Sequence, residues 1–149
     1  MPHSDETRLR VDRQLALSLY GAVGRVVRMH KPLLEPLGLT FPQYLVVVEL
    51  LGGSPRSVGE LGLTLGMDTG TITPLLKRME QGGTITRRRD TKDERRVLVA
   101  LTPSGAALRE GVLAIPAKIN SGCRMTDEQA NALRETLDEL AGATGGKAG

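Results

Sequence analysis

Apolar residues recur every three or four positions between residues 12 and 35, which is the spacing of one face of an α-helix. Pro32 lies near the end of this stretch, and proline removes a backbone donor from a helix. We therefore predict a long first helix that bends or ends near Pro32.

Three helical stretches follow, and each begins with a residue type that caps a helix N-terminus. Thr40 and Ser57 are each followed three positions later by glutamine or glutamate, which is the arrangement of a capping box. Asp68 is a third N-cap, and glycines end each stretch. The predicted helices cover residues 41–51, 58–65 and 69–81. The last two are separated by a short turn that contains glycine, which is the pattern of a helix-turn-helix.

After these helices the sequence alternates and becomes rich in β-branched residues, which is typical of strands. The two runs, 84–88 and 97–102, predict a hairpin. Its connection, residues 89–94, is mostly charged and longer than a tight two-residue turn, so we expect it to project into solvent as a wing.

Two more helices complete the predicted elements. Thr102 caps a fifth helix, 103–120, in which we expect a distortion at Pro116. A capping box that begins at Thr126 opens a sixth helix, which ends near residue 141.

This order of elements describes a mainly α fold with a small β-hairpin, an α+β arrangement of the winged helix-turn-helix type. The length fits one domain, in which residues 41–102 form the winged helix. Residues 12–36 and 103–141 have apolar faces that this unit cannot cover alone, and we expect them to form the dimerisation region of a homodimer. We expect the Gly- and Ala-rich tail, 142–149, to be disordered.

Composition narrows the classes of function. The single cysteine, Cys123, cannot form an intramolecular disulfide, which favours the reducing cytoplasm. No apolar run reaches the length of a membrane helix, so we expect no membrane partner. The chain has no Ser/His/Asp, Walker or metal-spacing pattern, and His3 and His30 are its only histidines. We therefore expect neither an enzyme nor a cofactor or metal site.

Positive charge is concentrated in one segment. Residues 77–96 carry eight basic and four acidic side chains, whereas the rest of the chain carries twelve basic and thirteen acidic ones. A basic patch beside a helix-turn-helix indicates contact with the phosphates of double-stranded DNA, although a solvated run of charge has the same composition.

The helix over 69–81 is the candidate for entry into the DNA major groove. Small residues at its N-terminus permit close approach to base edges, and threonine offers both a hydroxyl and a methyl group. Basic residues further along are placed to contact phosphates. The predicted contacts are Thr69, Gly70, Thr71, Thr73, Lys77 and Arg78.

The wing provides the second candidate surface. Asp93 lies two positions before Arg95, and we predict that its carboxylate braces the Arg95 guanidinium toward the minor groove, where narrow A·T tracts attract arginine. The alternative is a surface ion pair that contributes about 0 to 1 kcal/mol. The predicted wing contacts are Arg87, Arg88, Arg89, Asp93 and Arg95.

Several of these stretches resemble the MarR family of bacterial transcriptional regulators, and within it the organic-hydroperoxide-responsive, OhrR-like branch. The matching stretches are residues 31–34, 39–44, 68–78, 93–95 and 101–102. The resemblance implies a triangular dimer whose recognition helix and wing bind a pseudo-palindromic operator, usually as a repressor.

The sensor of that branch is altered in this sequence. The resemblance places its peroxide-reactive cysteine at Ala16 and its tyrosines at Tyr20, His30 and Phe41. Without a thiolate at Ala16, the first oxidation step has no nucleophile there. We therefore predict a small-molecule effector, aromatic or anionic, in a pocket near these four residues and Tyr44.

Two alternatives remain open. Cys123 lies near the position of a second cysteine in some members of the branch, and it would sense oxidants through an intersubunit or mixed disulfide. In the other alternative the protein is an architectural DNA-binding module without an effector. Such a module predicts little sequence preference and a steep salt dependence.

Overall fold

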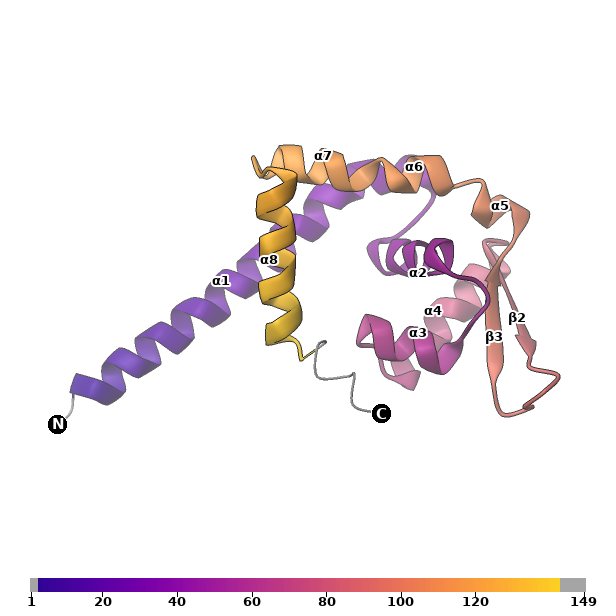
Figure 1. Ribbon diagram of the computed structural model, residues 1–149, viewed down its shortest axis with the longest axis horizontal. Helices are drawn as coiled ribbons and strands as arrows, with labels where there is room; N and C mark the ends of the chain where they lie inside the picture. The colour runs from indigo at the N-terminus through magenta and orange to yellow at the C-terminus, as the bar shows by residue number, and fades with distance from the viewer. Residues whose placement is uncertain (1–2, 143–149) are drawn as a thin grey trace. The chain divides into compact units, whose positions relative to one another are not determined.

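The computed structural model describes residues 3–142, which form eight α-helices, a short 3-10 helix and three β-strands (Figure 1). The chain divides into two compact units, Met1–Leu113 and Ala114–Gly149. The first unit contains the predicted winged helix, and the second contains the last two helices. The expected tail lies outside the described residues, apart from Gly142.

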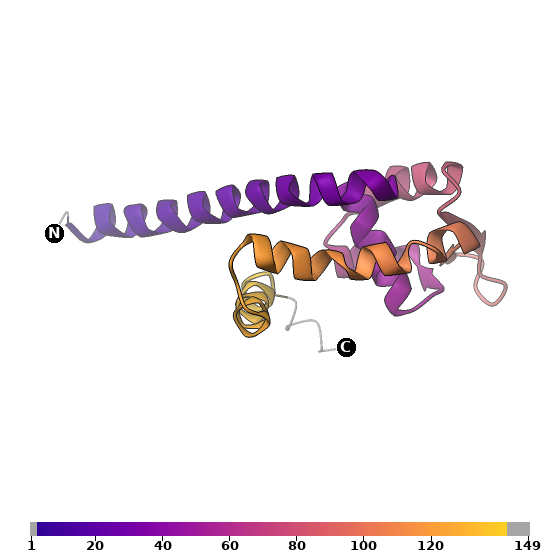
Figure 2. The ribbon, with the colours of Figure 1, turned by 90° about the horizontal axis from the view of Figure 1, so that it is seen from above.

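Helix α1 (His3–Leu34) begins earlier than predicted and ends two residues after Pro32, which lies inside its last turn. The 3-10 helix η1 (Glu35–Leu37) follows, and Gly38 ends it in the left-handed region, at a φ of 69°. Figures 1 and 2 both show most of α1 extending beyond the other elements of its unit. Leu15, Leu17, Tyr20 and Val23 of this helix are exposed in the single chain.

The predicted caps open the helices of the winged unit. Thr40 and Gln43 exchange hydrogen bonds of 3.4 and 3.1 Å at the start of α2 (Phe41–Gly52), which completes a capping box. Ser57 and Glu60 do the same at the start of α3 (Val58–Leu65), at 3.0 and 3.2 Å. The Asp68 carboxylate accepts the Thr71 N–H at 2.8 Å and opens α4 (Thr69–Gln81).

Two glycines allow α3 and α4 to meet closely. Gly66 ends α3 in the left-handed region, with a φ of 65°. At Gly62 a β-carbon would lie 2.8 Å from the Met67 carbonyl oxygen, so this position has no room for a side chain. The turn between the two helices therefore depends on glycine for conformation and for space.

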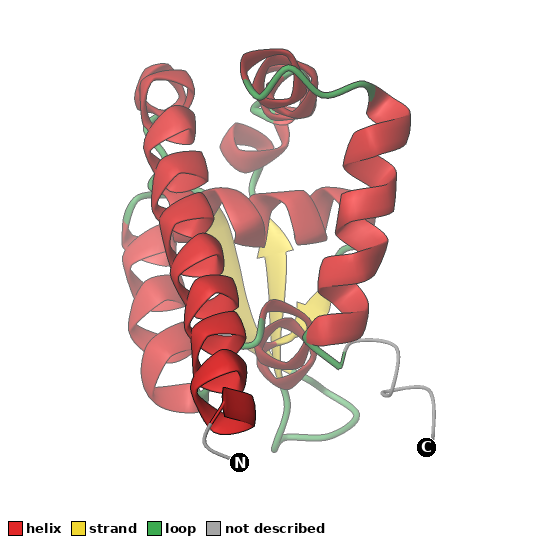
Figure 3. Cartoon of the chain, turned by 90° about the vertical axis from the view of Figure 1, so that its left-hand side faces the viewer, coloured by secondary structure: helices red, strands yellow, loops and turns green. Residues whose placement is uncertain are grey.

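The sheet contains one strand that the sequence did not predict (Figure 3). Strands β2 (Ile85–Arg89) and β3 (Val97–Leu101) form the predicted antiparallel hairpin, with Ile85 opposite Leu101. The short strand β1 (Arg56–Ser57) pairs with the other edge of β3, which gives the order β1-β3-β2. A strand of two residues is too short to show an alternating pattern in the sequence, so only its pairing with β3 identifies it.

The core of the first unit lies where α2, α3 and α4 pack against the sheet (Figure 1). The apolar face of α4 is buried, as its helical spacing predicted. The side chains that are almost fully buried there include Val46, Val47, Leu50, Leu61, Ile72, Leu76, Met79, Ile85 and Val99.

The predicted single helix over 103–120 is wrong, because the chain is interrupted twice. The observed helices are α5 (Pro103–Ala106), α6 (Arg109–Leu113) and α7 (Ile115–Gly122). Pro116 lies in the first turn of α7, where its missing N–H costs nothing, so the break occurs just before it. The final helix, α8 (Asp127–Leu140), begins at the predicted Thr126 cap.

Within residues 3–142 no single helix is both long and apolar enough to cross a membrane. Only the bent pair formed by Gln14–Leu37 and Phe41–Gly52, which meet at 72°, reaches that length and composition.

Candidate nucleic-acid interface

Helix α4 has two faces of different chemistry. Its buried face packs in the core, and every residue predicted to contact DNA from this helix is exposed. The exposed set is Thr69, Gly70, Thr71, Thr73, Lys77 and Arg78. The helix therefore presents threonines near its N-terminus and cations farther along.

Glu80 of α4 binds Arg87 of β2, a contact that no pattern in the sequence predicted. The Arg87 N–H donates to Glu80 Oε2 at 3.0 Å, and Arg87 Nη2 lies 3.1 Å from Glu80 Oε1. These bonds tie β2 to α4, and they leave the Arg87 side chain only 25% exposed. Among the described residues, Arg88, Lys92 and Arg95 of the wing have no side-chain partner. Arg89 donates to the Glu94 carbonyl oxygen at 3.0 Å. These cations are less constrained than Arg87.

The ion pair between Arg87 and Glu80 is expected to make the stability of the fold depend on pH in the acid range. The hydrogen bond from the Arg87 side chain lowers the pKa of Glu80 below its ordinary value of 4.5. Because the pKa of Glu80 is lower in the folded than in the unfolded state, its ionised carboxylate stabilises the fold fully above pH 4.5. This stabilisation is lost as the pH falls through the folded-state pKa. We expect Glu80→Gln to unfold at a lower temperature than the wild type at pH 7, with a gap that closes below pH 4.5.

Thermal unfolding across pH 2.5 to 7 measures this gap. Glu94→Gln is the matched control, because the Glu94 carboxylate makes no ion pair among the described residues. A gap between the wild type and Glu80→Gln that stays constant with pH would contradict the predicted role of the pair.

Asp93 organises the wing through its backbone contacts. The predicted bond from its carboxylate to the Arg95 guanidinium is not formed; Asp93 Oδ1 instead accepts the Arg95 backbone N–H at 3.1 Å. The reason is local: an aspartate carboxylate readily accepts the backbone N–H two residues further along the chain, which forms an Asx turn. Among the described residues the Arg95 guanidinium has no polar partner, and this side chain is exposed.

The recognition helix and the wing share one concave surface. A hollow of about 360 Å³ lies between the N-terminus of α3, helix α4 and the base of the wing. Thr73 of α4 lines this hollow together with Arg87, Arg95 and Arg96. The structure therefore brings the two predicted DNA-contacting surfaces together.

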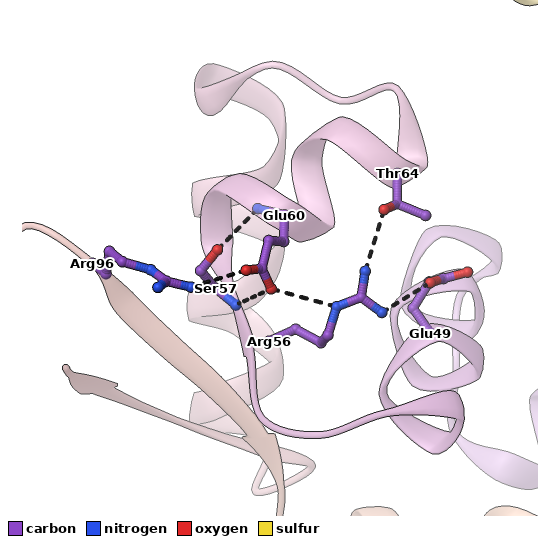
Figure 4. Close-up of polar contacts among 6 residues, drawn as sticks. All are labelled: Glu49, Arg56, Ser57, Glu60, Thr64 and Arg96. Atoms are coloured by element: carbon purple, nitrogen blue, oxygen red, sulfur yellow. Dashed lines mark hydrogen bonds and ion pairs between the residues drawn. The ribbon is translucent and has the colours of Figure 1, made fainter. Parts of the chain in front are cut away.

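A polar network beside this hollow connects α2, β1, α3 and the wing (Figure 4). Arg56 of β1 forms two ion pairs: its Nη1 lies 3.5 Å from Glu49 Oε2 of α2, and its Nε lies 3.5 Å from Glu60 Oε2 of α3. Glu60 Oε1 also lies 2.9 Å from Arg96 Nη2. None of these residues was predicted from the sequence as part of a site. The four-residue spacing of Arg56 and Glu60 was a visible signal, but the contact with Arg96 spans 36 positions.

Three of the residues predicted to line an effector pocket form an aromatic cluster. The His30 ring lies 4.9 Å from Phe41 and 5.5 Å from Tyr44 between centroids, and His30 Nδ1 is 2.7 Å from the Val26 carbonyl oxygen. Burial raises the pKa of the Tyr44 phenol. Ala16 and Tyr20 are exposed on α1, so in the single chain they lie outside the buried cluster.

An apolar groove of about 420 Å³ adjoins this cluster. Phe41 is the one predicted effector residue that lines it, beside Leu34 and Leu39. Arg28, Lys31 and Glu35 also line the groove, so that two cations and one carboxylate leave it with a net positive charge.

Cys123 follows the last turn of α7 and is partly exposed. It is the single cysteine of the chain. In the part of the chain that the structure describes, no cluster of His, Cys, Asp or Glu has the arrangement of a metal site.

Comparison with known proteins defines the family. The family described as "Transcriptional regulator SarA/Rot" matches residues 28–111. The chain is 40% identical over 132 residues to the organic hydroperoxide resistance transcriptional regulator of Bacillus subtilis, a match that covers 89% of this chain and 90% of that protein. The chain belongs to the MarR/SarA family of DNA-binding transcriptional regulators. Its relative MgrA of Staphylococcus aureus is 34% identical over 138 residues, 92% of each chain.

Solved structures agree with this MarR/SarA assignment. Reduced AbfR bound to DNA superposes with a TM-score of 0.77 at 28% identity, over 94% of this chain and 99% of that one, and AbfR is a protein of Staphylococcus epidermidis. These relationships confirm the predicted winged helix-turn-helix and the expectation of a regulator, not an enzyme. This MarR/SarA regulator differs from the OhrR-like branch as the sequence indicated, since its one cysteine lies at position 123.

Proposed function

We propose that this regulator is a cytoplasmic homodimeric repressor that binds a pseudo-palindromic operator through α4 and the wing, and that a small-molecule effector releases it. The observation that carries the proposal is the shared hollow, which places Thr73 of the recognition helix beside Arg95 of the wing. One surface is thereby able to follow a major groove and the adjacent minor groove of double-stranded DNA.

Exposed apolar side chains support the homodimer. On α1, the exposed fractions of Leu17 and Tyr20 are 64% and 85%, and on α8 Leu140 is 59% exposed. Exposed apolar stripes of this kind are typical of association surfaces. A two-fold pairing of copies would also present two recognition helices to successive turns of DNA.

The groove beside Phe41 supports an effector that is apolar with a negative group. Its walls are mainly apolar, and Arg28 and Lys31 outnumber Glu35 among its charged residues, which favours an anion over a cation. Exposed Ala16 and Tyr20 would join this region only if the second copy brought them near, so the complete predicted pocket requires the dimer.

Fluorescence anisotropy on DNA from upstream of the gene, beside scrambled DNA, tests the proposal. We expect the reduced protein to prefer the upstream DNA, and phenolic carboxylates to release it at saturating concentration. An organic hydroperoxide is expected to have no effect, because Ala16 provides no thiolate.

Other results of the anisotropy experiment would favour one of the two alternatives or contradict the effector. Release by hydroperoxide that is lost in Cys123→Ser would favour sensing by Cys123. Equal affinity for both DNA sequences, with a steep salt dependence, would favour an architectural module. Selective binding that no ligand alters would contradict the effector part of the proposal.

A further inference from the structure

One ion pair, between Arg96 and Glu60, joins the wing to the start of α3 at the edge of the hollow between α4 and the wing (Figure 4). Arg96 immediately precedes β3, and Glu60 lies in the first turn of α3. Arg96 Nη2 and Glu60 Oε1 are 2.9 Å apart. This contact connects the wing to the helix-turn-helix through side chains that were not predicted to touch DNA.

Arg96 also closes the wing loop with its backbone. Its N–H donates to the Asp93 carbonyl oxygen at 3.0 Å, and its carbonyl oxygen accepts the Asp90 N–H at 2.9 Å. The same Asp93 holds the Arg95 N–H through its carboxylate. A movement of Arg96 therefore displaces the segment that carries Arg95.

Glu60 is held independently of the wing. Its Oε2 accepts the Ser57 N–H at 3.2 Å and lies 3.5 Å from Arg56 Nε. Arg56 in turn contacts Glu49 of α2 at 3.5 Å and donates to Thr64 Oγ1 at 3.4 Å. The carboxylate that receives Arg96 is thus anchored to both α2 and α3.

We propose that Glu60 is a positioning residue for DNA recognition. Through Arg96 it holds the wing at the separation from α4 at which Arg95 and the N-terminus of α4 contact DNA at the same time. This role rests on the proposed contact of the wing with DNA, and it extends that function to a residue that does not touch DNA itself.

Charge alone predicts the opposite effect of removing Glu60. Glu60→Gln removes a negative charge near the DNA surface and frees Arg96 for phosphate contact, so simple electrostatics would strengthen binding. Glutamine keeps the capping box, because its amide oxygen accepts the Ser57 N–H equally well. The sign of the change in affinity therefore separates positioning from electrostatics.

The test measures operator affinity of the full-length chain by fluorescence anisotropy, well below the unfolding temperature of each variant. We expect Glu60→Gln to weaken operator binding about threefold to fivefold, the range available from an exposed ion pair, with little change on scrambled DNA. Glu49→Gln is the matched control, because it removes the same charge from the same network without contact to the wing. It is expected to bind as the wild type does.

A double variant completes the test. If Glu60 acts by positioning Arg95, Glu60→Gln will cause no further loss in an Arg95→Ala background, so the two effects are not additive. Unchanged or tighter operator binding by Glu60→Gln would overturn the inference, as would additive losses. Failure of the wild type to prefer operator DNA would count against the proposed function instead.

Discussion

Gly105→Ala is expected to destabilise the first unit by about 3 kcal/mol, because a β-carbon at this buried position would overlap the Thr84 carbonyl oxygen. That oxygen cannot easily retreat, since it accepts the Thr102 N–H at 3.1 Å and lies 3.1 Å from the Thr102 hydroxyl oxygen, whose nearer acceptor is the Gly83 carbonyl oxygen. The Leu101 side chain, 3.1 Å from the added carbon, closes the other side. The clash would separate the start of α5 from the base of the hairpin.

Thermal and urea unfolding measure this loss, which corresponds to a fall in melting temperature of about 10 °C for a chain of this size. Gly82→Ala is the matched control. Its β-carbon would lie 3.5 Å from the Arg78 carbonyl oxygen, an ordinary contact, and its φ of −77° suits alanine. Equal stability of the two variants would show that the backbone at Thr84 yields more readily than its hydrogen bonds indicate.

Arg95→Ala is expected to weaken operator binding about tenfold or more, which corresponds to roughly 1.4 kcal/mol or above. The Arg95 side chain is exposed, its backbone N–H is held by Asp93, and it lines the hollow beside Thr73. An arginine presented in this way suits a narrow minor groove. The loss should therefore be larger on operator DNA than on scrambled DNA.

Anisotropy titrations at several salt concentrations separate this contact from general charge. Arg109→Ala removes the same charge from α6, outside the helix-turn-helix and the wing, and serves as the control. We expect that variant to bind almost as the wild type does. Equal losses for both variants would mean that Arg95 contributes only to the net charge of the protein.

Local signals in the sequence were sufficient to predict where α2, α3, α4 and α8 begin. The caps at Thr40, Ser57, Asp68 and Thr126 bond to backbone groups three residues away, so neither their recognition nor their formation depends on the rest of the fold. The exposed face of α4 was predictable for the same reason, because helical spacing alone separates it from the buried face.

The sequence predicted which residues make up the candidate DNA surface, but it did not predict which of their side chains form ion pairs. The engagement of Arg87 by Glu80 joins a strand to a helix, and the contact between Arg96 and Glu60 spans 36 positions. Net charge identified the basic segment correctly, but charge cannot indicate which cations are already paired. Only the folded chain distinguishes Arg95, which faces solvent, from Arg87 and Arg96, which connect elements.

The sequence by itself determined the order of the helices, their caps, the wing and the membership in a family of DNA-binding regulators, because each of these depends on contacts within a few residues or on a continuous motif. Tertiary structure decided the strand β1 and the cross-link from Glu60 to the wing. The physical reason is that these features arise from groups distant in the chain, whose meeting depends on how the whole unit packs.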